Sequence, residues 1–597
     1  MIFVWIAVAV AAASYVMAVQ AQKKAQKAAD DMKGVLFNKE SNIEPIPVVY
    51  GTRRVGGVRV YVATKDVPDG DDNEFLYIAL VLCEGEVNAI TDIEVDGNPI
   101  TDSKYTDLYT INAFTGANGQ GSSSLIRQSD SAWTTDARLR GVAYLAIKLK
   151  WDEDAFQGIP TITALVQGKK IYDPRQNVNS PVYDASVGVG TQRPNNRSTW
   201  LYSDNPALCI RDYLTDDTYG KGLPESAIDY VAFAQAADDC EELFIPFLLG
   251  LQRKLFRTHA VLQTDKTLFE NIEMMLMGCR GFLPFNQGQY SLVIDKNRSS
   301  TFSFDLDNMT SGLQIKGVSK DTKYNQVTIK FANEAIGYEP DEVTYPSPTG
   351  TTAEQATRTA YLAEDNGTEL ALDVDLETVT NVYIARDFAQ VFLRRSRAGM
   401  VLQFKATSEA LNCSIGDTVT VTHPSLSPTL VPKLFQVSSL SFNYDGEVSV
   451  QLLEFDTTAY TYDTMNEIAD FAQPNLPDPF TVAAPSNLTG SSSTFLGSDG
   501  TVIPVITVTW TAAADSFVNR YIVEWKKTSE SSTAYRSATI QTTTFELTDV
   551  VIGTSYNVNV YSVNALGVKS EAVSITTAGV GDTTAPAKPT ALTATSG

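Results

Sequence analysis

The sequence predicts a multidomain α+β protein in which β-strands dominate. Short runs of β-branched and aromatic residues between turn signals recur over most of the 597 residues, whereas helical periodicity is confined to a few internal segments. Strands and helices do not alternate regularly, as they would in a parallel α/β sheet. A chain of this length is expected to hold several domains, each with its own core.

The chain begins with an uncharged run, residues 1–19, followed by a polar stretch that starts at Gln20. A helix of this length can just span the hydrocarbon of a bilayer. The run is rich in alanine, the best helix former, and the Ala/Lys/Gln composition continues to Lys33, before Gly34. We therefore predict an N-terminal apolar helix over residues 1–34, about 50 Å long at 1.5 Å per residue.

Three interpretations of this helix are open: a membrane anchor, a signal peptide, or a helix packed against protein in an assembly. No basic residue precedes the apolar run, as a secretory signal requires, although Val19-Gln20-Ala21 would serve as a weak cleavage site. The apolar side chains predicted to make the contacts of this helix, with protein or with a membrane, are Ile2, Phe3, Val4, Trp5, Ile6, Val8, Val10, Tyr15, Val16 and Met17.

The chain is strongly acidic, with 70 Asp+Glu against 46 Lys+Arg and a net charge of −24. Stable binding of nucleic acid needs Lys and Arg to neutralise phosphates, so a phosphate-binding surface is not expected. An acidic chain could instead line a conduit through which DNA passes without sticking. Three acidic clusters, at 69–74, 238–242 and 364–377, are predicted to be solvated faces or loops.

The five cysteines are Cys83, Cys209, Cys240, Cys279 and Cys413, and none belongs to a CxxC motif. With only two histidines, His259 and His423, far apart in the sequence, a zinc site is not expected. An odd number of scattered cysteines in apolar contexts predicts buried, reduced thiols and folding in a reducing cytoplasm.

The first part of the body is predicted to be mostly β. Strands are expected at 46–50, 58–63 and 75–81, followed by short strands between 87 and 147 and an exposed loop at 115–124. Residues 164–166 and 169–172 are predicted to be two strands joined by a turn at Gln167-Gly168. Helices are expected at 206–214, at 226–243 with Ser226 as its N-cap, and at 267–277.

From Leu313 the pattern returns to strands, at 325–331, 399–407, 418–422, 434–442 and 448–455. Between the first two of these, residues 380–398 form a predicted helix that carries Arg386, Arg394, Arg395 and Arg397. Residues 473–483, with Pro474, Pro477 and Pro479, form a stiff proline-rich linker.

Residues 484–578 resemble a fibronectin type III domain. Trp510, the alternation in 521–525, Leu547 and the alternation in 556–561 trace a seven-strand sandwich, and Tyr556 lies where a tyrosine corner would be. The motif PSNLT at 485–489 recurs as PTALT at 589–593, so residues 579–597 are predicted to begin a second, incomplete repeat. Since one strand cannot bury a core, further chain or partner chains would have to complete it.

No sequence motif for catalysis is present: there is no phosphate-binding glycine loop, HExxH, GxSxG or CxxC. His259 and His423 have no nucleophile context and are predicted to be structural. We therefore expect no enzymatic activity, no cofactor and no metal.

Several short motifs, in order over roughly residues 40–460, resemble the central tail-tip hub, or J-like host-specificity, protein of lambda-type long-tailed bacteriophages. They are PIPVVYG (45–51), PTI (160–162), GKKIYDPR (168–175), NPAL (205–208), RDYLTD (211–216), YGKGLP (219–224), YNQV (324–327), IGDTV (415–419), KLFQV (433–437) and LLEFD (452–456). Fibronectin modules after the hub also suit this family.

The resemblance implies a virion protein of the phage tail tip, assembled in the host cytoplasm, that closes the tail tube as a homotrimer and opens for genome ejection. Expected partners are the distal tail protein, other tail-tip proteins, the tape-measure C-terminus, a host receptor and transiting DNA. The N-terminal helix could plug the lumen and enter a membrane on ejection. The family is usually longer and carries a receptor-binding tip absent from this sequence.

The domains implied are a hub β-barrel with an inserted β domain (35–200), a helical and α/β segment (201–312) and a second hub β-barrel (313–472). The alternative function is a membrane-anchored surface adhesin with a fibronectin stalk. Its ectodomain would be free of cysteine or paired in disulfides, and the odd number of scattered cysteines does not fit this. A carbohydrate-degrading enzyme with an accessory fibronectin domain would need paired carboxylates in a cleft.

Overall fold

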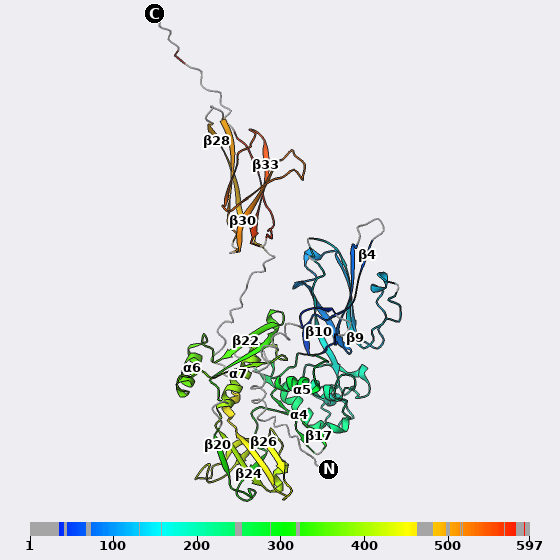
Figure 1. The fold of residues 1–597 in the computed structure, drawn as a ribbon, viewed down its shortest axis with the longest axis vertical. Helices are drawn as coiled ribbons and strands as arrows, with labels where there is room; N and C mark the ends of the chain where they lie inside the picture. The colour runs from blue at the N-terminus through cyan, green and yellow to red at the C-terminus, as the bar shows by residue number, and fades with distance from the viewer. Residues whose placement is uncertain are drawn as a thin grey trace, which may run out of the picture. The chain divides into compact units, whose positions relative to one another are not determined.

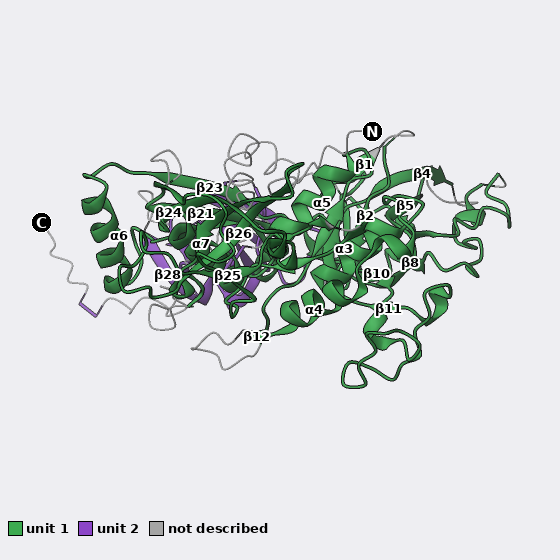
Figure 2. Ribbon diagram, turned by 90° about the horizontal axis from the view of Figure 1, so that it is seen from below, with its two compact units in different colours: residues 1–469 green, residues 470–597 purple. Residues whose placement is uncertain are grey.

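The computed structural model divides the chain into two compact units, residues 1–469 and 470–597 (Figures 1 and 2). It describes residues 35–591 apart from 41–43, 67–72, 131, 154, 157, 245–252, 287, 318–322, 462–481, 497–501, 514, 516, 566 and 581–589. The predicted N-terminal helix and most of the second fibronectin-like repeat lie outside the described residues.

The first unit opens with a five-stranded sheet. In spatial order its strands are β1 (Lys39–Glu40), β4 (Val58–Lys65), β5 (Phe75–Glu84), β9 (Val142–Lys150) and β8 (Tyr109–Thr115). Alternate residues of β5 face two different cores, Ile78, Leu80 and Leu82 one of them and Tyr77, Ala79 and Val81 the other. Burial on both faces explains why β5 is a continuous apolar run rather than an alternating one.

A second sheet packs on the first of these cores. It contains β11 (Leu201–Tyr202), β10 (Ile162–Ile171), β6 (Val87–Val95) and β7 (Asn98–Pro99), with β3 (Thr52–Val55) also paired to β10. The preceding strand β2 (Val48–Tyr50) pairs instead with β14 (Ala260–Leu262).

The predicted turn at Gln167-Gly168 is wrong, because β10 runs unbroken through both residues. Gly168 is needed for a close approach of two chain segments: a Cβ there would lie 2.1 Å from the Val49 carbonyl oxygen. Its N–H donates to the Gly51 carbonyl at 2.7 Å.

Three helices follow, α3 (Pro206–Thr215), α4 (Tyr230–Glu241) and α5 (Leu268–Met277). Thr267 and Glu270 form a capping box that begins α5 where the sequence predicts it. The predicted N-cap of α4, Ser226, is wrong: residues 225–227 form a 3-10 turn, and Asp229 accepts the N–H groups of Val231 and Ala232.

Small two-stranded ladders lie between α4 and α5 and after α5. They are β12 (Leu243–Phe244) with β13 (Arg253–Lys254), β15 (Gly281–Phe282) with β18 (Val293–Ile294), and β16 (Phe285–Asn286) with β17 (Gln289–Tyr290).

A three-stranded sheet of β22 (Glu339–Tyr345), β21 (Gln326–Asn333) and β23 (Ala371–Asp375) packs against α7 (Val382–Arg397). Asn381 caps α7, which confirms the helix expected at 380–398. A further helix, α6 (Thr352–Glu364), has no counterpart among the predicted elements. Only Glu354 of α6 is buried, so the helix has no apolar stripe to detect.

The last part of the first unit is a six-stranded sheet of β19 (Phe302–Phe304), β25 (Thr418–Val421), β26 (Lys433–Phe442), β27 (Val448–Glu454), β24 (Met400–Ala406) and β20 (Gln314–Gly317). In β24 and β27 buried apolar residues alternate with partly exposed ones. The strands predicted at 399–407, 418–422, 434–442 and 448–455 are thereby confirmed within a residue or two.

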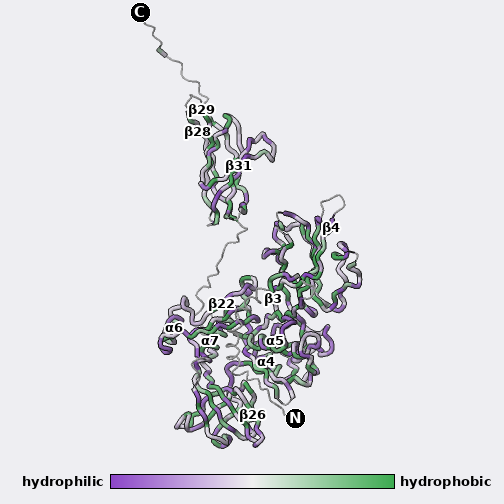
Figure 3. Tube along the Cα trace, viewed as in Figure 1, coloured by the Kyte–Doolittle hydropathy of each residue, from purple (hydrophilic) through white to green (hydrophobic). Residues whose placement is uncertain are grey.

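The second unit is a seven-strand sandwich. One sheet contains β28 (Ser486–Leu496), β29 (Val502–Thr511) and β32 (Thr544–Leu547), and the other β31 (Arg536–Ile540), β30 (Val518–Lys527), β33 (Ser555–Asn564) and β34 (Val573–Ala578). Hydrophobic and hydrophilic residues alternate along its strands (Figure 3), which places Trp510, Tyr521 and Leu547 in one core. The tyrosine corner is confirmed, because the Tyr556 hydroxyl accepts the Val551 N–H at 3.0 Å.

Replacing Tyr556 with phenylalanine removes only this hydroxyl and leaves the ring in the core. We expect the free energy of unfolding of the sandwich to fall by about 1 kcal/mol, the usual net value of such a bond. Hydrogen exchange of the β33 amides in the intact chain measures the loss. Tyr535→Phe, on the connection between β30 and β31, is the control, and equal effects of the two substitutions would contradict the assignment.

The described residues confirm a β-dominated α+β chain with five α-helices and a C-terminal fibronectin-like sandwich. All five cysteines are unpaired and buried, as predicted. The two hub barrels remain a prediction.

Candidate functional site

The apolar residues predicted to contact a lumen or membrane, Ile2 to Met17, lie outside the described residues. No helix in the described part of the chain has both the length and the apolar character needed to cross a membrane. The candidate site lies where the structure brings the sequence motifs together.

Four of those motifs meet at the Lys169 ammonium, which is buried between β10 and α3. Its Nζ lies 3.3 Å from the carboxylates of both Asp212 and Asp216. It also lies 4.1 Å from the centre of the Tyr219 ring. Asp212 accepts the Tyr50 hydroxyl at 2.6 Å. We call these five residues the Lys169 cluster; it joins the N-terminal sheets to the helices.

Burial raises the pKa of Tyr50 well above its ordinary value, and the neighbouring Asp212 carboxylate adds to this shift. The phenol therefore keeps its proton and remains a hydrogen-bond donor to Asp212.

The sequence predicts that the acidic cluster at 238–242 is a solvated face or loop. In the structure, this cluster also makes ion pairs with buried partners. Arg175, whose side chain is 2% exposed, contacts Asp238 at 2.7 Å and Glu241 at 3.0 Å from the neighbouring helix α4. Asp239 is buried and pairs with Lys296 and Arg298. In the cluster at 364–377, the Asp365 side chain is 5% exposed and pairs with Lys323 and Arg397. These acids hold separate chain segments together.

A second close approach joins β2 and β3 to the segment that precedes β14. Gly51 has φ +67°, and a Cβ there would lie 1.9 Å from the Thr258 carbonyl oxygen. The adjacent Thr52 N–H donates to His259 Nδ1 at 2.9 Å, and the His259 N–H donates to the Thr378 carbonyl at 3.0 Å. His259 thus links three parts of the first unit, which agrees with its predicted structural role.

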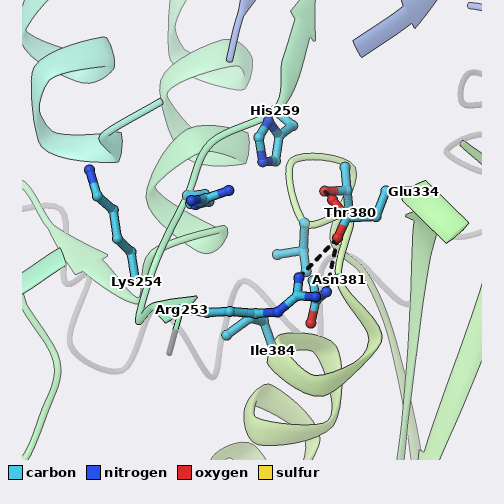
Figure 4. A pocket seen from close by; sticks show the side chains of 9 residues that line it. Arg253, Lys254, His259, Glu334, Thr380, Asn381 and Ile384 are labelled. Atoms are coloured by element: carbon cyan, nitrogen blue, oxygen red, sulfur yellow. Dashed lines mark hydrogen bonds and ion pairs between the residues drawn. The ribbon is translucent and has the colours of Figure 1, made fainter. Parts of the chain in front are cut away.

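His259 also lines a pocket between residues 253–259 and the beginning of α7 (Figure 4). Because Nδ1 accepts a hydrogen bond, the neutral ring carries its proton on Nε2, the other ring nitrogen. Burial lowers the pKa of His259 to about 4; Arg257 and Arg53 also lower it, whereas Asp204 and Glu334 raise it.

Each cation of this pocket already has a carboxylate partner. Arg253 contacts Glu334 at 3.1 Å, Lys254 contacts Glu241 at 2.8 Å, and Arg257 contacts Asp204 at 3.4 Å. Glu334 further accepts hydrogen bonds from Thr380 and Asn381. The pocket is therefore a charge-balanced joint between segments and offers no unpaired charge for a ligand.

The described residues contain no group of histidine, cysteine or acidic side chains that could hold a metal ion. The other histidine, His423, accepts the Ser425 N–H through Nδ1 at 3.1 Å, in the turn after β25. These side chains instead hold separate segments of the first unit together.

The His259 joint is expected to weaken as the pH falls. The unfolded chain binds a proton at His259 near pH 6.5, whereas the folded chain does so only near pH 4. Stability contributed by the neutral ring is thus complete above pH 6.5 and is lost as the pH falls towards 4. His259→Asn keeps an acceptor for the Thr52 N–H but does not titrate. Its urea-unfolding midpoint should depend less on pH between 7 and 4.5 than that of the native chain; identical pH profiles would contradict the assignment.

The members of the Lys169 cluster could be singled out from the sequence, because all five belong to motifs that carry the resemblance. They are Tyr50, Lys169, Asp212, Asp216 and Tyr219. Their meeting point was not predicted. No motif marks Arg253 or Glu334, whose roles depend wholly on the fold.

Two family models and two curated proteins match this chain. Residues 270–431 match the family described as "Putative phage tail protein", and residues 504–578 match the fibronectin type III domain. The chain is 20% identical over 564 residues to the baseplate hub protein pb3 of Escherichia phage T5, which covers 80% of this chain and 55% of pb3. This chain is a relative of phage tail-tip hub proteins.

Similarity to a second curated protein is more local. The chain is 24% identical over 225 residues to the tip attachment protein J of Escherichia phage SECphi27, covering 36% of this chain and 18% of that protein. It thus spans only about half the length of pb3 and less than a fifth of the J protein.

Among solved structures, a chain of the virion of a native gene transfer agent particle aligns at 16% identity and a TM-score of 0.49, covering 73% of this chain and 89% of that one. The predicted resemblance to tail-tip hub proteins and the fibronectin type III domain are both confirmed by the sequence matches.

Proposed function

We propose that this chain is the structural hub of a phage tail tip, that three copies close the distal end of the tail tube, and that the hub opens for DNA ejection. The observation that carries the proposal is the similarity to a baseplate hub protein over 80% of the chain. It is supported by the Lys169 cluster, in which four motifs of the hub resemblance form one buried joint. The relatives are named as tail components, which supports a location at the virion tail tip and a role without catalysis.

The proposed hub barrels are residues 35–200 and 313–472, with the helical segment 201–312 between them. A trimer would then present six barrels to a tube of sixfold symmetry. The distal tail protein would contact this ring, and the modules after the linker would reach toward the host receptor. The apolar residues 2–17 would occupy the lumen near the tape-measure protein and would meet a membrane only on ejection.

Peptide mass spectrometry of purified virions, together with the native mass of the purified chain, tests this function. We expect the chain in intact particles and a mass of three copies in solution. Its absence from virions, or its presence only in the host membrane fraction as a surface adhesin would require, would overturn the proposal.

The luminal part of the proposal has its own test. With a net charge of −24, the lumen of the trimer is expected to be acidic, so that DNA does not bind while it passes. A structure of the assembled tip with a neutral or basic lumen, or with residues 2–17 outside the lumen, would contradict it.

A further inference from the structure

Residues 455–461 form the last described segment of the first unit. A short 3-10 helix, η9 (Thr457–Tyr460), follows β27 and lies against α7. Thr461 is the last described residue of the first unit before the fibronectin unit, so tension that acts on Thr461 is transmitted through η9. Among the described contacts of the first unit, those that hold η9 are therefore the first to bear this tension.

Four side chains from four separate segments close a hydrogen-bonded ring at this point. The Tyr460 hydroxyl donates to Asp295 Oδ1 at 2.6 Å and accepts from Arg395 Nη1 of α7 at 2.6 Å. Gln436 of β26 completes the ring: its Oε1 accepts from Arg395 Nη2 at 2.6 Å, and its Nε2 donates to Asp295 Oδ1 at 2.9 Å. We call these four residues the Tyr460 ring.

The Tyr460 ring holds one positive and one negative charge away from water. The Arg395 side chain is 13% exposed and that of Asp295 is 4% exposed, with their nearest N and O atoms 3.6 Å apart. Burial raises the pKa of the Tyr460 phenol well above its ordinary value, so it stays protonated and can donate to Asp295. Loss of Tyr460 from the ring would leave both charges without one of their hydrogen-bond partners, at a cost that low-dielectric surroundings increase.

Helix α7 also holds the backbone of η9. Arg394 donates to the carbonyl oxygens of Thr458 and Thr461, one before and one after Tyr460 in the chain. Ala459 is buried, and the aromatic side chain of Tyr460 stacks on that of Phe455 with centroids 5.3 Å apart. The last described segment of the first unit is thus held by two adjacent arginines of one helix.

The Tyr460 ring is in turn connected to the core of the helical segment. The Asp295 N–H donates to the Arg280 carbonyl at 2.9 Å, and Arg280 Nη1 contacts Asp387 of α7 at 2.7 Å. The Gln436 amide also donates to the Gly416 carbonyl at 3.1 Å, at the beginning of β25. Release of η9 would therefore disturb α7, the six-stranded sheet and the helical segment together.

We propose that residues 456–461 are a latch: tension on the chain beyond Thr461 detaches η9, opens the Tyr460 ring and thereby loosens α7 from the six-stranded sheet. The latch is a property of the first unit alone. Its use as a trigger, through which receptor engagement by the modules after the linker is transmitted to the hub, rests on the proposed function.

Constant-force extension of the full chain, with handles on tags at its two ends, tests the latch. Tyr460→Phe keeps the aromatic side chain stacked on Phe455 but removes the hydroxyl and its two hydrogen bonds. We expect the lifetime of the first unfolding step of unit 1 under load to shorten by about tenfold, as loss of buried polar partners implies. Tyr444→Phe is the matched control, because Tyr444 is fully exposed on the hairpin between β26 and β27 of the same sheet.

A second variant, Arg394→Gln, weakens the hold on the backbone of η9 while leaving the Tyr460 ring in place, and should also shorten the lifetime. Without load, Tyr460→Phe should increase hydrogen exchange in η9, in the last turn of α7 and in β26 by similar factors. Lifetimes of both variants equal to that of Tyr444→Phe, or an exchange increase confined to η9, would overturn the latch. Absence of the chain from virions would overturn the proposed function and leave this result intact.

Discussion

Lys169→Met is expected to lower the free energy of unfolding of the N-terminal sheets and the helices joined to them by about 3–5 kcal/mol. This is the range found when one partner of a buried ion pair is removed. The side chains of Lys169, Asp212 and Asp216 are 3%, 4% and 1% exposed. Without the ammonium, two carboxylates remain in a site that water does not reach. Arg197 still contacts Asp216, but its own side chain is 58% exposed and screens little of the buried charge.

The measurement is the urea concentration at which peptides from β10 and α3 lose protection from hydrogen exchange in the intact chain. Lys170→Met is the control, because Lys170 pairs with Glu86 in a partly exposed ion pair and its loss should cost about 1 kcal/mol or less. The triple variant with Asp212→Asn and Asp216→Asn should recover part of the stability, since it removes the unpaired charges. Equal effects of Lys169→Met and Lys170→Met would show that the cluster is not a stabilising joint.

The strands of the six-stranded sheet could be predicted because their information is local. In β24, Leu402, Phe404 and Ala406 face the core while the residues between them are partly exposed, and a window of a few residues shows this alternation. Helix α7 was predictable for the same reason, since its apolar face is continuous and Asn381 provides the cap.

The errors arise where a distant segment decides the outcome. Gln167-Gly168 has the composition of a turn, but Gly168 is required by the backbone of Val49, more than a hundred residues earlier. Ser226 and Asp229 are both good N-caps, and Asp229 caps the helix because the chain before it is drawn into a bridge between Ile228 and Tyr290. Helix α6 is fixed by the buried pair Glu354–Arg386, which no periodicity reveals.

The same distinction applies to the candidate site. The sequence identified the members of the Lys169 cluster as parts of motifs, yet the long-range partners in these joints are separated by 43 to 207 residues and could not be paired. Tyr50 and Asp212 are 162 positions apart, and Tyr460 and Asp295 are 165. For the proposed structural role, the residues that matter are those that make long-range contacts, and local sequence patterns reveal such contacts least.

Gly51→Ala is expected to disrupt the joint between the N-terminal sheets and β14. The added Cβ would meet the Thr258 carbonyl at 1.9 Å and His259 Nδ1 at 2.7 Å, and φ at this position is +67°. The backbone would have to move, which would break the Thr52 to His259 hydrogen bond and the register of β2 on β14. We expect a loss of about 4 kcal/mol or more in the free energy of unfolding, a size that marks a specific structural failure.

Gly97→Ala separates the two causes of this loss. Gly97 also has a positive φ, +77°, but a Cβ there would meet no atom within 4 Å. It should therefore cost only the left-handed strain of about 1–2 kcal/mol. Urea unfolding followed by hydrogen exchange in β2, β3 and β14 compares the two variants. If Gly51→Ala and Gly97→Ala cost the same, the close approach of Gly51 to Thr258 is not tight in solution, and the joint would have room to slide.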